Sequence, residues 1–396
     1  MFEILSLKNG LDNLDSFFSD ALNCGLRPNK EQGDLAFIRS KNLSLCTAVF
    51  TTNRFCAAPI KHAKAYGEVF ESNFVLINAK NANAMTGQKG VEDIKEILDS
   101  LPKDLDIKNP LMSSTGVIGY RLPKEKIING LKKLDFSAKN SNKLANAILT
   151  TDSFKKELCF KVALEDGSSF KIAAVAKGAG MINPAMATML CFIATDAKVP
   201  KEDIKELLAD AVDNSFNKIS VDGDTSTNDT VLLMANGQSN VYNKEAFKEA
   251  LNRITFELAM MILRDGEGAN KVVAFEVVGA KDNLQAKKAA VNLSNSLLVK
   301  TALFGQDPNW GRIASTIGAS NIECDEDKLE IYYDDLLIYS KDYPELDSKR
   351  EEQAFKIMQQ DSFKIKCNLG LGDGEYTSYG CDLSYEYVKI NAEYRT

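Results

Sequence analysis

The spacing of apolar residues predicts strands in the first third of the chain. Apolar and polar residues alternate over 34–40 and 44–53, as in half-buried strands. The nearly continuous apolar run 73–80 predicts a strand that is buried on both faces. Two further runs, 157–164 and 170–176, flank the turn-forming stretch EDGSS and predict a hairpin.

Helical spacing dominates the middle of the chain, and strand-like runs return at its end. The predicted helices include 201–216, 244–266 and 283–303, where apolar residues recur every three or four positions. The late strands are expected over 328–339 and 363–370, with a last one over 379–391. Strands and helices do not alternate regularly, so the pattern favours a layered α+β protein over a doubly wound sheet.

Composition and charge narrow the class of protein. The chain has 396 residues, 44% hydrophobic and 26% charged, as in soluble globular proteins of two or three domains. Its net charge of −7 argues against a nucleic-acid partner, which requires a basic face. No apolar run reaches the roughly 18 residues of a membrane helix, and the N-terminus lacks signal-peptide features. We therefore expect a cytoplasmic protein without membrane contact.

Cysteine and histidine usage limits the available chemistry. The eight cysteines form no C-x-x-C pair, so we expect reduced, mostly buried thiols and no metal site. The chain has one histidine, His62, in a lysine-containing segment where an exposed or packing role is expected. Any Ser-His-Asp or Cys-His mechanism would need that residue. An enzyme of this sequence must therefore find its base elsewhere.

Three polar segments could form part of a site, although each also fits an ordinary turn. SSTG at 113–116 offers a hydroxyl and a glycine N–H that could stabilise an oxyanion. The loop 220–230 is rich in Asp, Thr and Ser but lacks the register of a calcium loop. Glu267 lies between two glycines after a predicted helix and could bind an ammonium group.

Thr188 offers a route to acyl transfer without histidine. It follows the small Ala187 and precedes a predicted strand. If the bond between them is cut, Thr188 gains an α-amine with a pKa of about 7.7–8.0, which can accept the proton of its own hydroxyl. The segment thus reads either as a loop entering a strand or as a self-cleavage site.

Motifs along the whole chain resemble those of the ornithine acetyltransferases, also called glutamate N-acetyltransferases, of arginine biosynthesis. The matching segments are AVFTTNRFCAAP, NANAMTGQKG, STGVIG, LTTDSFKK, AKGAGMINPAMATML, SVDGDTSTNDT, RDGEGANK, FGQDPNWGRI and YVKINAEYRT. The resemblance implies self-cleavage between Ala187 and Thr188, giving an α chain (1–187) and a β chain (188–396). Thr188 would then carry acetyl from N-acetylornithine to glutamate in a ping-pong cycle.

The same resemblance implies roles for particular residues. Thr115 and Gly116 would form the oxyanion hole. The expected substrate contacts are Thr150, Thr151, Lys177, Thr188, Glu267, Asn391 and Thr396, with either or both of the first two threonines in contact. Lys177 suits the substrate carboxylate, and Glu267 or the Thr396 carboxylate suits the side-chain ammonium. Lys80 departs from the family pattern, because a glycine is expected there.

The resemblance also implies the fold and the assembly. The expected fold is an α+β sandwich of two β-sheets between helical layers, as in ornithine acetyltransferases and the aminopeptidase DmpA. The expected assembly is a heterotetramer of two α and two β chains, with no cofactor, although acetyl-CoA could serve as a second acetyl donor. Two rival hypotheses are a self-processing aminopeptidase of the related sandwich fold and an amino-acid-binding protein that never cleaves itself.

Overall fold

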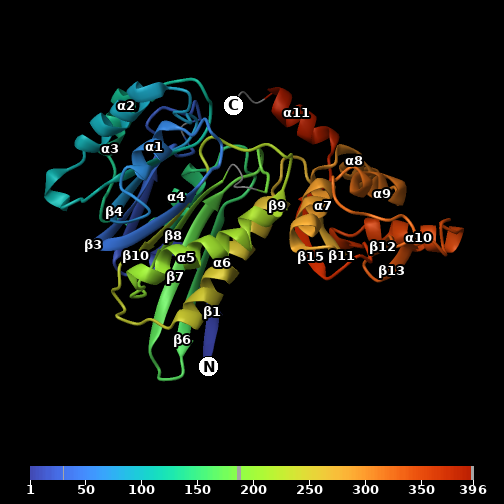
Figure 1. Ribbon diagram of the computed structural model, residues 1–396. Helices are drawn as coiled ribbons and strands as arrows, with labels where there is room; N and C mark the ends of the chain where they lie inside the picture. Colours follow the sequence, from blue (N-terminus) through green and yellow to red (C-terminus); the bar gives the residue numbers. More distant parts are fainter. Residues whose placement is uncertain (30, 185–188, 394–396) are drawn as a thin grey trace.

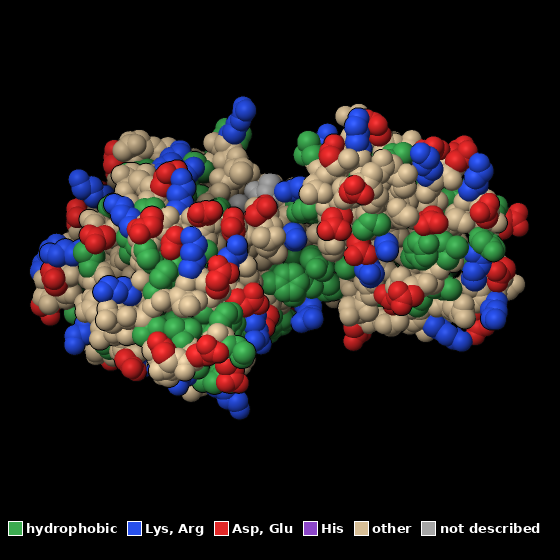
Figure 2. Space-filling view, turned by 60° about the horizontal axis from the view of Figure 1, so that its bottom comes forward, with side chains coloured by type: hydrophobic (Ala, Val, Ile, Leu, Met, Phe, Trp, Pro, Cys, Tyr) green, Lys and Arg blue, Asp and Glu red, His purple; other side chains and the backbone are tan. Residues whose placement is uncertain are grey.

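The chain folds into a large and a small lobe joined by a narrow waist (Figures 1 and 2). The computed structural model describes residues 1–29, 31–184 and 189–393. Acidic and basic side chains are interspersed over both lobes in the view of Figure 2. In the part of the chain that is described, no helix combines the length and apolarity needed to cross a bilayer.

The large lobe is built on one nine-stranded sheet that folds back on itself through β3 (Leu35–Phe50). β3 pairs with β4 (Val69–Asn78) along much of its length, with a register shift between Arg39 and Ser44. Its other edge pairs with β2 (Phe17–Leu22) over 35–40 and with β10 (Thr230–Ala235) over 45–50, so the two ends of β3 join different layers. The remaining strands of this sheet are β1 (Phe2–Ser6), β5 (Leu111–Ser114), β6 (Lys156–Leu164), β7 (Ser169–Lys177) and β8 (Leu190–Thr195).

Alternating side chains of β3 show why the sheet forms a sandwich. Ala36, Ile38 and Cys46 share a central core with β2, β4 and β5 on one side and β7, β8 and β10 on the other. Leu35 and Phe37 point the opposite way, toward the outer helices. The period of two along a strand therefore places one face of β3 in the centre of the lobe.

Helices cover both outer faces of the sandwich. On one side α5 (Lys201–Asp213) and α6 (Lys244–Arg264) pack on β6, β7, β8 and β10. On the other, α2 (Gly87–Asp99) and α3 (Lys124–Leu131) pack on β3 and β4. The shorter elements of this lobe are η1 (Gly10–Asn13), α1 (Ala58–Lys64), η2 (Lys103–Leu105), α4 (Ser141–Ala147) and η3 (Phe216–Lys218).

The small lobe contains a six-stranded sheet with its own core and helices. Its strand order is β13, β12, β14, β11, β15, β9. The strands are β9 (Ile219–Ser220), β11 (Val272–Ala280), β12 (Glu330–Tyr333), β13 (Leu336–Tyr339), β14 (Ser362–Asn368) and β15 (Gly374–Cys381). The helices are α7 (Asn283–Asn295), α8 (Leu297–Gly305), α9 (Trp310–Gly318), α10 (Ser348–Met358) and α11 (Tyr385–Glu393).

The predicted sandwich of two β-layers between helices is confirmed, with two additions. One folded sheet supplies both layers of the large lobe, and a second sheet forms a separate lobe. Strands on both sides of the Ala187–Thr188 bond share the large sheet, because β7 pairs with β8 at Lys177 and Leu190. The boundary between the lobes therefore does not coincide with the predicted boundary between α and β chains.

The prediction of a strand over 379–391 is wrong in its second half. β15 ends at Cys381, and Tyr385–Glu393 forms α11, which has no buried residue. A longer strand would need β11 as its partner, but the N–H groups of Asn270 and Lys271 before β11 donate to the Asp382 carboxylate instead. The alternating apolar residues of this segment consequently fold as an exposed helix.

Candidate active site

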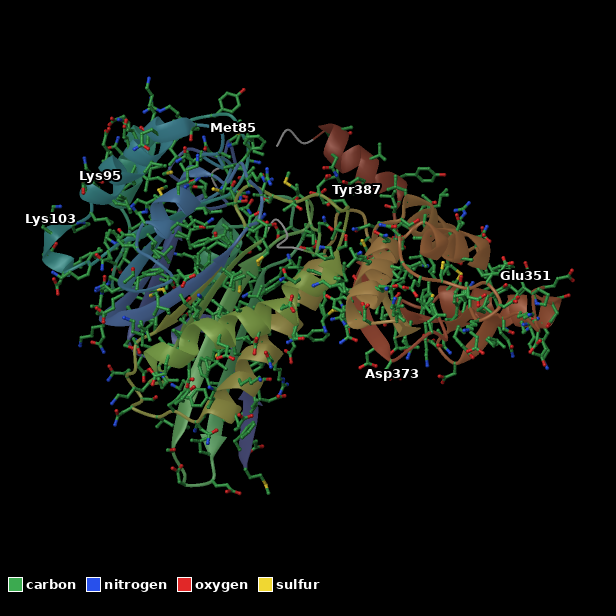
Figure 3. The ribbon with its side chains drawn as sticks, viewed as in Figure 1. Met85, Lys95, Lys103, Glu351, Asp373 and Tyr387 are labelled. Carbon is green, nitrogen blue, oxygen red and sulfur yellow. The ribbon has the colours of Figure 1, made fainter. Side chains whose placement is uncertain are left out.

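A cavity lies where strand ends of the large lobe face the start of the small lobe and α11. Figure 3 shows α11, which carries Tyr387, extending from the small lobe toward the part of the large lobe that carries Met85. The cavity is lined by Thr115, Gly116, Ile118, Thr150, Thr151, Lys177, Gly180, Met181, Ser226, Thr227, Asn228, Glu267 and Asn391. Every candidate site residue predicted from the sequence and placed in the described structure thus borders one cavity.

Three predicted residues lie outside the described structure. Thr188 and Ala187 fall within the segment 185–188, and Thr396 falls within 394–396. Met181, shortly before the first segment, lines the cavity. Met189, directly after that segment, donates its backbone N–H to Asp229 at 3.0 Å, and the neighbouring Asn228 lines the cavity. Residues on both sides of the predicted nucleophile in the sequence thus lie at the cavity or next to one of its lining residues.

The turn at Gly116 requires glycine. Its φ is +130°, and a Cβ placed there would lie 2.2 Å from the carbonyl carbon of Lys80 and 2.5 Å from the nitrogen of Asn81. The preceding Thr115, which follows β5 directly, is buried and donates its N–H to Asn78 O at 3.0 Å. The backbone geometry therefore fixes the Thr115 hydroxyl and the Gly116 N–H at the cavity wall.

The opposite side of this turn contains the one departure from the family pattern. Lys80 has a φ of +72°, in the left-handed region that favours glycine. Its carbonyl accepts a hydrogen bond from Val117 N at 3.3 Å. The expectation of glycine at this position thus has a structural basis, although the chain uses lysine.

Lys177 is a buried cation at the end of β7. Its Nζ donates to Thr115 Oγ1 at 3.4 Å and lies 3.9 Å from a carboxylate oxygen of Asp152. Burial lowers the pKa of Lys177, and the negative charge of Asp152 opposes that shift. The ammonium therefore lies directly beside the predicted oxyanion hole.

Glu267 reaches the cavity from the loop after α6. Its backbone N–H donates to Ala179 O at 2.9 Å, and its carboxylate accepts from Asn391 Nδ2 of α11 at 2.7 Å. A Cβ at Gly180 would lie 2.5 Å from this carboxylate, so the glycine provides the space that Glu267 occupies. The cavity consequently has a cation on one side and a carboxylate on the other.

The loop 220–230, which the sequence shows only as a polar segment, forms part of the cavity wall. Ser226, Thr227 and Asn228 are buried and line the wall. Asn228 Nδ2 donates to Ala82 O at 2.7 Å and Ser114 O at 2.9 Å, which ties the loop to β5. The loop is therefore part of the cavity wall and not a plain surface turn.

Asp229, within this loop, has a buried carboxyl group. One carboxyl oxygen accepts from Met189 N, whereas Oδ2 has no hydrogen-bond partner in the part of the chain that the structure describes. Burial raises the pKa of Asp229 well above its usual value. Burial therefore favours the neutral form of this carboxyl.

The histidine is remote from this chemistry. His62 lies on α1, packs edge-on against Tyr66 with ring centroids 5.5 Å apart, and is absent from the residues lining the cavity. Among the described residues, no group of three or more His, Cys, Asp or Glu side chains is arranged to hold a metal ion.

Comparison with known proteins shows to which family the chain belongs. The model of the ArgJ family matches residues 19–396. The arginine biosynthesis bifunctional protein ArgJ of Wolinella succinogenes is 56% identical, and the alignment covers the whole of both chains. That of Oceanobacillus iheyensis is 40% identical over all of this chain and 98% of its own. The chain belongs to the ArgJ family.

Two solved structures are also similar to parts of the chain. A crystal structure of ArgJ from Bacillus halodurans is 38% identical, with a TM-score of 0.48, and covers 51% of this chain and 98% of its own. An ornithine acetyltransferase from Mycobacterium tuberculosis complexed with ornithine is 23% identical, with a TM-score of 0.40 and 48% and 100% coverage. Membership of the ArgJ family rests on the sequence matches.

Family membership decides between the hypotheses drawn from the sequence. An ArgJ protein is an enzyme of arginine biosynthesis, an acyltransferase that acts as a glutamate N-acetyltransferase. The full-length relatives named above are ArgJ proteins, which argues against the self-processing aminopeptidase. It also argues against a binding protein without catalytic activity.

Proposed function

We propose that this ArgJ protein transfers acetyl from N-acetylornithine to glutamate through an acetyl ester on Thr188. The observation that carries the proposal is the gathering of Thr115, Lys177, Glu267 and Asn391, from segments far apart in the sequence, around one cavity. Since the single histidine lies elsewhere, the base is the α-amine of Thr188, which exists only after cleavage of the Ala187–Thr188 bond.

Each wall of the cavity has a part in this reaction. The Thr115 hydroxyl and the Gly116 N–H stabilise the oxyanion that forms when Thr188 attacks the acetyl carbonyl. Lys177 pairs with the α-carboxylate, which both substrates carry. Glu267, together with the Thr396 carboxylate, receives the ornithine ammonium, and Asn391 orients Glu267. Thr150 and Thr151 both border the bound substrate.

Cleavage would leave the two products firmly associated. β8, which would belong to the chain 188–396, pairs with β7 of the chain 1–187, and β10 pairs with β3. The α and β chains therefore share one sheet. We assign to the enzyme the heterotetramer of two α and two β chains that the family resemblance implies, and a cytoplasmic location.

Acetyl-CoA is the second acetyl donor in this proposal. The support is the name of the relatives, since a protein 56% identical over its whole length is called bifunctional. Acetyl transfer from acetyl-CoA to glutamate would use the same acetyl-Thr188 ester. No metal and no other cofactor has a part in the reaction.

A denaturing gel and an acetyl-transfer assay test the proposal together. Wild-type protein should give two bands, and Thr188→Ala should stay full length and transfer no acetyl. A single full-length band for an active wild-type enzyme, or normal cleavage in Thr188→Ala, contradicts the mechanism. Glutamate with acetyl-CoA alone should yield N-acetylglutamate, and its absence would limit the enzyme to recycling acetyl from N-acetylornithine.

A further inference from the structure

Four buried charges lie behind the cavity and form what we call the Asp152 cluster: Asp152, Lys156, Lys177 and Asp265. Their side chains are at most 3% exposed. Lys156 Nζ is 2.8 Å from Asp152 and 2.5 Å from Asp265, and Lys177 Nζ is 3.9 Å from Asp152. The two positive and two negative charges balance without solvent, as buried ions require.

Asp152 is the centre of this cluster and touches several segments that line the cavity. One of its oxygens accepts from Gly178 N at 2.6 Å, and the other accepts from Thr150 N at 3.0 Å. Thr150 and Lys177 border the cavity, whereas Asp152 does not. The carboxylate therefore lies one layer behind the surface that meets the substrate.

The charges around Lys177 leave Asp152 as its principal counter-ion. Asp152, Lys156, Glu267 and Asp229 all act on its ammonium. Asp152, 3.9 Å away, has the largest effect of the three carboxyl groups. Burial raises the pKa of Asp229, Lys156 repels the ammonium, and Glu267 faces the site assigned to the substrate ammonium. Burial acts to remove the proton of Lys177, so Asp152 is the group that retains it.

We propose that Asp152 is a positioning residue that keeps the Lys177 ammonium charged and held at the cavity, where it binds the α-carboxylate of either substrate. Lys156 fixes Asp152 in turn, and Asp265 fixes Lys156 while both of its carboxylate oxygens accept from the single backbone N–H of Ser153 at 3.1 Å. This inference rests on the proposed function, in which Lys177 receives the substrate carboxylate.

The test is the pH dependence of KM in Asp152→Asn, which keeps the size of the side chain and removes its charge. KM for N-acetylornithine and for glutamate should rise at alkaline pH, where Lys177 loses its proton. The pH at which this rise begins should fall by about 1–3 pH units, the usual effect of removing one opposite charge nearby.

Two further variants separate a charge effect from a structural one. Asp152→Glu keeps the charge and should leave the onset of the KM rise where wild type has it. Asp203 pairs with Lys244 at a distance of 2.7 Å, and neither residue lines the cavity. Asp203→Asn should therefore change neither KM nor its pH dependence. The inference is overturned if Asp152→Asn retains the wild-type onset, or if Asp152→Glu shifts it equally.

A fourth variant distinguishes failure of the inference from failure of the proposed function. Lys177→Met should raise KM for both substrates at every pH and abolish the alkaline rise. If it leaves KM unchanged, Lys177 does not bind the carboxylate and the proposed function is wrong at this residue. If Lys177→Met raises KM but Asp152→Asn has the KM profile of wild type, only the role of Asp152 is wrong.

Discussion

The two walls of the cavity are built in opposite ways. The wall of the large lobe includes residues at or next to strand ends, and three of these, Thr115, Lys177 and Asn228, are at most 6% exposed. The facing wall includes α11, a helix without a buried residue, on which Asn391 is exposed. Side-chain bonds from α11 to the rest of the protein include Asn391 to Glu267 at 2.7 Å and Tyr387 to Asp222 at 3.4 Å.

This difference shows which side of the cavity must hold its hydrogen-bonding groups in fixed positions. An oxyanion is stabilised only by donors that are already in place, and strand ends in a packed sandwich provide such donors. The end of the substrate that does not react requires only charge complementarity, which a helix on the surface can provide. Substitutions in the large-lobe wall should therefore lower the stability of the protein or its rate of catalysis. Substitutions in α11 should have little effect on either.

Lys156→Met should have the largest effect, on the stability of the large lobe. It leaves Asp152 and Asp265 buried without their shared cation, so the free energy of unfolding should fall by about 3–5 kcal/mol. Lys177 and Lys156 outweigh the effect of burial and lower the pKa of Asp152 to about 2. In wild type this stabilisation is complete above about pH 4 and is lost as the pH falls through about 2.

In Lys156→Met, the loss of stability on acidification should begin at a higher pH than in wild type. Denaturant titrations between pH 3 and pH 7 measure both effects. Lys244→Met, which removes an exposed cation paired with Asp203, is the matched control and should change the free energy of unfolding by less than about 1 kcal/mol. Equal losses in the two variants would contradict the role assigned to the buried cluster.

Gly116→Ala should have the next largest effect, on catalysis. The added Cβ meets the backbone of Lys80 and Asn81, so the turn must move and the oxyanion donor moves with it. Self-cleavage and acetyl transfer should both slow by about 100–1000-fold. Gly119→Ala, at a glycine with positive φ but open space around it, is the control, and a comparable loss there would show that the close approach at Gly116 is unimportant.

Glu267→Gln tests the facing wall and should affect one substrate only. N-acetylornithine has a side-chain ammonium and glutamate does not, so kcat/KM for N-acetylornithine should fall about 10–100-fold, as expected for loss of a hydrogen bond between charged groups. KM for glutamate should change less than about twofold by the same reasoning. Steady-state kinetics with each substrate varied in turn provide the measurement, and equal losses for both would exclude a specific ammonium contact.

Asn391→Ala should have the smallest effect. It removes the hydrogen bond from α11 to Glu267, which is worth about 1 kcal/mol, so KM for N-acetylornithine should rise about fivefold. The melting temperature should be unchanged, because α11 buries no residue. A marked loss of stability would show that the two walls are equally integrated in the fold, and Lys389→Ala on the same helix is the control.

Much of the fold could be predicted where one face of an element is buried. The apolar spacing of 201–216 and 244–266 corresponds to α5 and α6, and the run 73–80 corresponds to β4. The predicted helix over 283–303 is two helices, because the Ser296 side chain caps α8 by accepting from Val299 N. A capping residue inside an apolar pattern leaves that pattern intact, so periodicity alone missed the break.

The sequence predicts which types of residue form the candidate site, but not how they are arranged in space. The glycine at 116, the lone histidine and the threonine after Ala187 limit the chemistry whatever the fold. Ser226, Thr227 and Asn228 were recognised only as a polar loop. Asp152 and Lys156 lie four residues apart in LTTDSFKK, but Lys177 and Asp265 come from two other segments, so the sequence does not show that the four charges meet.

The sequence by itself determined which residues face a core and which chemistry is available. Burial of one face of a strand or helix is a local property, and so is the preference for glycine where the backbone has positive φ. Only the tertiary structure decided that β3 belongs to two layers, that 385–393 is a helix, and that Lys177 and Glu267 face one cavity. These outcomes depend on contacts between segments far apart in the chain, whose energies no local pattern contains.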